Sequence, residues 1–313
     1  MSENVLFRVL KIVYKRWVAP SLGNTFRFKL TYLSKHGYWP DLENPRSMME
    51  KITWLLRNDR NPLRAKVADR ILAREFVAQH APECKLPANL WIGTEFTQDV
   101  WDALPQKFVI KGNHGSQMTR LVDKAKDGHE AVRLATRAWL DIDYSQLHQE
   151  WVYAKAQRVL VVEEMLELDA ASPPDWKFMC GNGRVLLIAV DLARFSQPTR
   201  NIYNREFVRL RNARIDTAQG PDIAKPASFD KAVRLAEQLT APFDFIRADL
   251  YIVGDDIYFG EMTNFPSAAM DALEPKALDF EIGSQITLDG LSHQTLTGFN
   301  DFCETAQHTS QMH

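Results

Sequence analysis

The stretch FIRADLYIVGDDIYFGEMTN, residues 245–264, decides the fold because it contains two apolar strands joined by a tight turn. We expect strands at 245–252 and 257–261, with the turn at 254–256. Alternation places Arg247 and Asp249 on one face of the first strand, and the returning strand can bring Glu261 beside Asp249. Charges on apolar strands are costly to bury unless they are paired. The hairpin therefore predicts a sheet that carries a charged site.

The carboxylates of Asp249 and Glu261 suit a divalent cation. Two carboxylates that face each other repel unless a cation lies between them, and Mg²⁺ takes hard oxygen ligands together with phosphates. Thr263 and Asn264 add neutral oxygens two and three residues beyond Glu261. The alternative is a salt bridge from Arg247 to Asp249 or Glu261, without a metal.

A lysine and a glycine-containing loop follow an earlier strand. Lys111 ends the apolar run 107–111 and precedes Gly112-Asn113-His114-Gly115-Ser116. A lysine at a strand end offers a fixed cation, and glycines let backbone N–H groups approach a phosphate. The alternative is a surface loop with a solvated lysine. For His114 a proton relay and a histidine satisfied by the backbone both stay open.

Two adjacent carboxylates, Glu163 and Glu164, interrupt the apolar run 159–166. Side chains alternate along a strand, so one carboxylate can face a pocket and accept a hydrogen bond from an exocyclic amine. Exposure of both at a strand end is the alternative.

The remaining pattern predicts an α+β protein. Asn182-Gly183 is the turn of a further hairpin. The expected helices are 47–57, 63–80, 128–140, 143–157 and 229–240. The expected strands are 90–92, 107–111, 120–122, 159–162, 177–179 and 184–190.

The net charge of −2 conceals two regions of opposite sign. Residues 1–40 hold seven basic side chains and one acid, a charge of +6, which leaves −8 for the other 273 residues. This composition excludes a disordered chain and a protein that mainly grips nucleic acid. An amphipathic basic helix is expected over 5–17; it either lies on an anionic membrane or caps the core. No stretch is apolar enough to span a membrane, and three cysteines are too few for a disulfide framework, so we expect a cytoplasmic protein.

Taken in order, several stretches resemble the TupA-like ATP-grasp family, named for a protein of teichuronopeptide synthesis. The resemblance covers roughly residues 30 to 290. The stretches that carry it are 44–52 with Trp54-Leu55, 59–63, 66–70, 108–116, 162–166, 175–178, Val190-Asp191 with Arg194-Phe195, 247–251 and 258–263.

The resemblance implies an ATP-grasp fold, in which two α+β lobes clamp ATP. The implied ATP-binding residues are Lys66, Lys111, Gly112, Asn113, His114, Gly115, Ser116, Glu163, Glu164, Met165, Leu166 and Lys177. Asp249 and Glu261 are the implied Mg²⁺ ligands, and the third ligand stays open between Thr263 and Asn264. Arg194, Arg247 and Lys177 are implied to hold or activate the carboxylate substrate.

The implied domains are a basic helical region (1–86), a lid lobe (87–170), a C-terminal lobe with the metal site (171–290) and a loosely packed tail (291–313). The implied activity is an ATP- and Mg²⁺-dependent carboxylate–amine ligase of surface-polysaccharide, capsule or cell-envelope synthesis, which forms an acylphosphate and then an amide. Its substrates would be a sugar acid and an amino acid. If the basic helix lies on a membrane instead of capping the core, residues 1–20 would make a peripheral contact with the inner membrane face.

Three alternatives remain: a phosphotransferase (kinase) that uses the same cleft, a polysaccharide glycosyltransferase, and a membrane-associated assembly factor without turnover.

Overall fold

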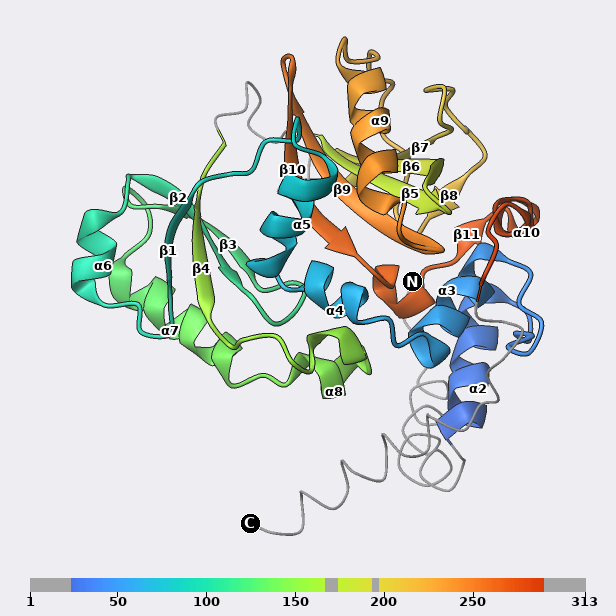
Figure 1. Ribbon diagram of the computed structural model, residues 1–313, viewed down its shortest axis with the longest axis horizontal. Coiled ribbons are helices and arrows are strands. Elements are labelled where there is room, and N and C mark those ends of the chain that lie inside the picture. Colours follow the sequence, from blue (N-terminus) through green and yellow to red (C-terminus); the bar gives the residue numbers. More distant parts are fainter. Residues whose placement is uncertain (1–23, 167–173, 193–196, 290–313) are drawn as a thin grey trace.

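The computed structural model describes residues 24–166, 174–192 and 197–289, which form two large antiparallel sheets and a third sheet of two strands, with helices around them (Figure 1). The expected helix over 5–17, Arg194 and the tail 291–313 lie outside the described residues. The α+β class expected from the sequence is confirmed. None of the helices within the described ranges is long and apolar enough to cross a membrane.

The larger sheet has five antiparallel strands in the order β10-β9-β5-β6-β7. The strands are β5 (Asp175–Gly181), β6 (Arg184–Leu192), β7 (Thr199–Tyr203), β9 (Phe245–Val253) and β10 (Asp256–Thr263). The predicted hairpin turn between β5 and β6 is confirmed, because Asn182 and Gly183 both have positive φ, at 49° and 73°. Asparagine and glycine tolerate this conformation best, so the sequence fixes the reversal locally.

The two faces of this sheet differ in chemistry. One face carries Phe178, Ile188 and Ala248 and packs under α9 (Phe229–Thr240), which lies across the sheet in Figure 1. The opposite face is apolar at one end, where Met179 and Phe245 join the core beneath α3 (Met48–Asn58) and α10 (Lys276–Ser284). Two residues further along β5 and β9, the same face carries charged side chains. The candidate site lies there.

The smaller sheet has four antiparallel strands in the order β1-β4-β2-β3. Its strands are β1 (Asn89–Gly93), β2 (Lys107–Gly112), β3 (Thr119–Asp123) and β4 (Leu160–Glu164). One face packs against α6 (Gln98–Ala103) and α7 (His129–Leu140) through a core that includes Trp101, Phe108 and Val132. The other face carries Lys111 and Glu163 and is not part of that core.

The helix expected over 63–80 is wrong as a single element. The chain forms α4 (Pro62–Ala68) and α5 (Leu72–His80), with a break at 69–71. The break is stabilised because Asp69 accepts the N–H groups of Ile71 and Leu72 at 2.9 and 3.0 Å, at the start of α5. In Figure 1 both helices lie between the two sheets.

The helix expected over 143–157 is also wrong in extent. Helix α8 covers Tyr144–His148 and ends where Gln149 adopts a left-handed conformation with φ of 57°. A short 3-10 turn, η3, follows at Trp151–Tyr153. The pattern missed α2 (Asn24–His36), α10, β7 and the two-stranded sheet of β8 (Arg214–Ile215) and β11 (Leu273–Glu274).

Candidate functional site

Asp249 is the centre of a charged cluster on the five-stranded sheet. Its partners in register are Glu261 on β10 and Lys177 on β5, and it is only 3% exposed. Lys177 Nζ lies 3.2 Å from Asp249 Oδ2. The prediction that the returning strand brings Glu261 beside Asp249 is confirmed.

A β-bulge at Gly260 makes that pairing possible. Phe259 pairs with Leu250 and Glu261 pairs with Asp249, so Gly260 is an extra residue in β10. In a regular ladder Gly260 would oppose Asp249, and the Glu261 side chain would lie on the other face of the sheet. A Cβ at position 260 would lie 2.9 Å from the Asp249 carbonyl oxygen, so the bulge depends on glycine.

Arg247 holds Asp249 through a two-pronged contact. Its Nε donates to Oδ1 at 2.6 Å and its Nη2 to Oδ2 at 2.7 Å. Nη2 also donates to Thr263 Oγ1 at 3.0 Å and lies 3.6 Å from Glu261 Oε1. Burial would lower the pKa of Arg247, but the charge and hydrogen bonds of Asp249, together with the charges of Glu261 and Asp175, outweigh burial and raise that pKa. The salt bridge that was left open as an alternative to a metal is therefore present in this structure.

Arg70, at the break between α4 and α5, holds Glu261 from the other side. Its Nη1 donates to Glu261 Oε2 at 3.1 Å. Burial would raise the pKa of Glu261, but the guanidinium groups of Arg70 and Arg247 outweigh it and lower that pKa to about 2. No role is predicted for Arg70 from the sequence; the signal that separates it from Arg64 and Arg74 is its place in the stretch 66–70, which carries the family resemblance.

The cluster extends across the sheet beyond the predicted residues. Lys177 also pairs with Asp175, and its Nζ lies 3.7 Å from Asp191 Oδ2. Arg200 on β7 grips Asp191 with contacts of 2.5 and 3.0 Å. Burial would lower the pKa of Lys177, but Asp249 and Asp175 outweigh burial and raise it. Alternation along β5, which puts Asp175 on the face of Lys177, is the signal that could have identified Asp175.

The smaller sheet contributes a second ion pair, between Lys111 and Glu163. Lys111 Nζ lies 2.5 Å from Glu163 Oε2, and both side chains are largely buried. Glu164 points elsewhere and accepts the N–H of Ala88 at 2.8 Å. Met165 and Leu166 continue from the end of β4 and are half-buried.

The loop 112–116 is held mainly by contacts within the protein. The N–H groups of Gly112 and Asn113 donate to the carbonyls of Met118 and Val159, at 2.8 and 2.9 Å. The buried His114 contacts the Trp139 carbonyl through Nε2 at 3.0 Å, so the backbone satisfies this one ring nitrogen, and no hydrogen-bond partner is described for Nδ1.

The glycines of this loop allow close packing. A Cβ on Gly112 would lie 2.9 Å from Met118 Sδ, and one on Gly115 would lie 2.8 Å from the Tyr144 ring.

Two other expected residues make separate contacts. Asn264 Nδ2 donates to the Arg64 carbonyl at 3.0 Å, and its Oδ1 accepts from Arg64 Nη1 at 3.3 Å. Thr263, in contrast, stays beside Glu261, with its hydroxyl 3.3 Å from Oε1. Lys66 Nζ lies 3.4 Å from Glu75 Oε2, and the Lys66 side chain is 33% exposed. Of the two candidates for a third metal ligand, the structure brings Thr263 and not Asn264 to the carboxylate pair.

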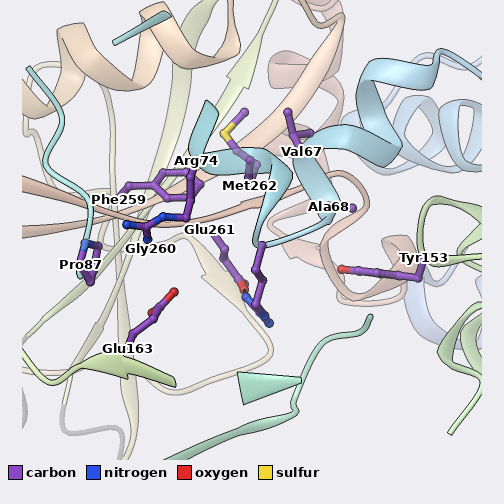
Figure 2. Close-up of a pocket in the computed structure, with 12 residues that line it drawn as sticks. Val67, Ala68, Arg74, Pro87, Tyr153, Glu163, Phe259, Gly260, Glu261 and Met262 are labelled. Carbon is purple, nitrogen blue, oxygen red and sulfur yellow. Dashed lines mark hydrogen bonds and ion pairs between the residues drawn. The ribbon is translucent and has the colours of Figure 1, made fainter. Parts of the chain in front are cut away.

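A small pocket opens beside Glu261 at one end of the charged cluster (Figure 2), and the volume in it that water can occupy is about 20 Å³. In this structure the pocket therefore has room for little more than one water molecule. Glu163 reaches it from β4 and Arg74 from α5. Arg70, Gly260 and Glu261 belong to its lining.

The chemistry of the carboxylate pair fits Mg²⁺. Across residues 24–166, 174–192 and 197–289, no three His, Cys, Asp or Glu side chains gather as a complete metal site. Mg²⁺ commonly takes one or two carboxylates together with substrate phosphates, and Asp249, Glu261 and the Thr263 hydroxyl supply such oxygens. Arg247 and Arg70 hold these oxygens in this structure, so a metal ion would compete with two guanidinium groups.

Comparison with known proteins gives one extensive match. The model of the TupA-like ATP-grasp family matches residues 50–287, which include both sheets and every described residue of the charged cluster. None of the curated proteins compared with the chain matches it.

Solved structures offer distant likenesses. The D-alanine–D-alanine ligase of Bacillus anthracis complexed with ATP is 13% identical, with a TM-score of 0.37 and coverage of 64% of this chain and 54% of that chain. The ADP complex of an N5-carboxyaminoimidazole ribonucleotide synthetase is also 13% identical, with a TM-score of 0.42 and coverage of 72% and 52%. The D-alanine–D-alanine ligase of Helicobacter pylori is 12% identical, with a TM-score of 0.40 and coverage of 71% and 59%.

This chain spans little more than half the length of these ligases. The family assignment therefore rests on the family model.

Proposed function

This chain belongs to the TupA-like ATP-grasp family, and from that premise we propose that it is an ATP- and Mg²⁺-dependent carboxylate–amine ligase. The observation that carries the proposal is the pairing of the buried Asp249 with the partly exposed Glu261, surrounded by Lys177, Arg247 and Arg70. Two carboxylates among three cations suit polyanionic ligands and a divalent ion, and Glu261 and Arg70 also line the small pocket beside them.

The proposed reaction has two steps. In the first, a carboxylate oxygen of the substrate forms a bond to the γ-phosphorus of ATP while the bond from that phosphorus to the β–γ bridging oxygen breaks, which gives an acylphosphate and ADP. In the second, an amine nitrogen bonds to the acyl carbon, inorganic phosphate leaves, and the surplus proton passes from nitrogen to solvent. The product is an amide.

The residues of this chain would act by positioning and by charge neutralisation. Lys111 and Lys177 offer ammonium groups to phosphate oxygens. Arg247, whose guanidinium already grips a carboxylate, can fork onto the carboxylate of the substrate. Asp249 and Glu261, with Thr263, would hold Mg²⁺, which supplies further neutralisation of phosphate charge when it is bound.

The proposal also covers the class of substrate and the location of the protein in the cell. We propose a sugar acid as the carboxylate and an amino acid as the amine, in surface-polysaccharide synthesis on the cytoplasmic side of the membrane. The family name supports this pathway. The charge of +6 on residues 1–40 supports an anionic partner at that end.

Trapping with hydroxylamine tests the activity. The full chain is incubated with ATP, Mg²⁺, a panel of uronic acids and hydroxylamine, and ADP and hydroxamate are both measured. A ligase gives hydroxamate that depends on ATP and on one member of the panel, and Lys111→Ala should give none.

A stable phosphorylated sugar without hydroxamate would instead indicate a kinase. Consumption of a nucleotide sugar without ATP hydrolysis would indicate a glycosyltransferase, and ATP binding without ADP formation would indicate an assembly factor.

A further inference from the structure

Arg70 contacts both sheets with a single guanidinium group. Its Nε donates to the Gly112 carbonyl at 3.0 Å and its Nη2 to the Gly115 carbonyl at 3.2 Å, both in the loop that follows β2. Its Nη1 donates to Glu261 on β10 of the other sheet, at 3.1 Å. One side chain therefore bridges the glycine-containing loop and the carboxylate pair.

The backbone around Arg70 is fixed by the same loop. The N–H of Arg70 donates to Asn113 Oδ1 at 2.9 Å, and Asn113 Nδ2 donates to Asp69 Oδ2 at 2.9 Å. Asn113 is fully buried, and Asp69 in turn accepts the first N–H groups of α5. The helix break, the loop and the guanidinium thus form one hydrogen-bonded unit.

We propose that Arg70 is a positioning residue that couples the charge of Glu261 to the conformation of loop 112–116. The contacts that carry this inference do not depend on the reaction. Its importance for catalysis rests on the proposed function, because residues 112–116 are among the ATP-binding residues that the family resemblance implies.

Electrostatics gives the coupling its direction. Arg70 is almost fully buried, and a buried cation is costly unless an anion compensates for it. Glu261 is the only acid among the groups to which Arg70 donates in the described chain; the others are neutral carbonyls and the Asn113 amide. Without the charge of Glu261, the guanidinium is held less firmly against Gly112 and Gly115. Glu261 itself makes no described hydrogen bond to the loop, whereas Arg70 bonds both, so Arg70 is the hydrogen-bonded connection between them.

Hydrogen exchange of the full chain without nucleotide tests the coupling, measured on peptides that cover 112–117. In Arg70→Gln the loop amides should exchange about tenfold faster, because two charge-assisted hydrogen bonds to the loop are lost. Glu261→Gln should also speed loop exchange, by a smaller factor. In the double variant exchange should be no faster than in Arg70→Gln alone. Arg70→Lys keeps the positive charge but not the several N–H donors of the guanidinium group. Its loop amides should therefore exchange at a rate between those of wild type and Arg70→Gln.

Matched controls separate coupling from general loosening. Arg74→Gln removes an arginine of the same pocket that has no side-chain hydrogen bond within the described residues, and it should leave loop exchange unchanged. Amides of β6 should stay protected in every variant.

The proposal is overturned if the loop amides of Glu261→Gln exchange at the wild-type rate. It is also overturned if the increase in exchange rate in the double variant equals the product of the increases in the two single variants. If Arg70→Gln does not fold, the same comparison between Glu261→Gln and its double variant with Arg70→Lys decides the question. Neither result depends on ATP turnover, so a failed ligase assay would leave this test intact.

Discussion

Gly260→Ala is the substitution that tests most sharply how the fold builds the site. Gly260 is the bulge residue that allows Glu261 to pair with Asp249. The added methyl group would lie 2.9 Å from the Asp249 carbonyl oxygen and 3.2 Å from the Tyr251 ring. The nearer neighbour is backbone in a central strand, so β10 must shift to accommodate the methyl group.

The expected cost follows from that contact. Overpacking a well-packed site typically costs about 1–3 kcal/mol, and β10 is an edge strand that can move, so we expect about 1–2 kcal/mol. Any shift of β10 also moves Glu261 relative to Asp249. Binding of Mg²⁺-nucleotide should therefore weaken by about tenfold or more, although the fold persists.

Urea unfolding and titration with Mg²⁺-ADP measure the two effects. Gly128→Ala is the comparison variant, because a Cβ there meets nothing within 4 Å and its φ is −92°. Gly128 is the N-cap of α7, where alanine is a poorer cap, so stability should fall by no more than about 1 kcal/mol, and nucleotide affinity should stay near that of wild type. If Gly260→Ala keeps wild-type stability and wild-type nucleotide affinity, the role assigned to the bulge is wrong.

Three further substitutions test other parts of the structure. Lys111→Ala should abolish ADP formation while far-UV circular dichroism stays unchanged; wild-type turnover would contradict its assignment. Burial and the charge of Glu261 raise the pKa of Glu150 from 4.5 to about 8, so the unfolding free energy of the wild type should fall by about 5 kcal/mol as pH rises through that window. In Glu150→Gln the unfolding free energy, measured by urea titration, should be the same at pH 5 and pH 8.5. An equal fall in wild type and variant between these pH values would refute the raised pKa of Glu150. Phe178→Ala, at a fully buried position in β5, should cost about 3–5 kcal/mol in the same assay, and a loss below 1 kcal/mol would contradict its place in the core.

Local patterns predicted the parts of the fold that local interactions determine. The helix expected over 229–240 matches α9, because its apolar spacing agrees with the sheet face it covers. The turn at Asn182-Gly183 was equally legible, because few residues tolerate positive φ. The break at 69–71 was missed because one of its main partners, Asn113, is more than forty residues away in the sequence.

Which side chains of one strand share a face could be predicted from the sequence. The register between strands and the contacts from other elements could be predicted less well. Alternation placed Arg247 and Asp249 on one face, and the hairpin brought in Glu261. The bulge that sets the register is invisible in an apolar–polar pattern, since Gly260 reads as an ordinary strand residue. The roles of Arg70 and Arg200 were missed because each depends on a tertiary contact, with Glu261 and with Asp191, that no local pattern predicts.

The central claim is that Asp249 and Glu261 hold a metal ion that binds together with ATP. Calorimetric titration of a non-hydrolysable ATP analogue, with and without Mg²⁺, tests this claim most directly when wild type is compared with Asp249→Asn. Asparagine keeps the size of the side chain and an acceptor for Arg247 but removes the charge that a metal ion needs. We predict binding that requires Mg²⁺ in the wild type and is weakened at least about tenfold in the variant. Equal affinity with and without Mg²⁺, or equal affinity in the two proteins, would contradict the account.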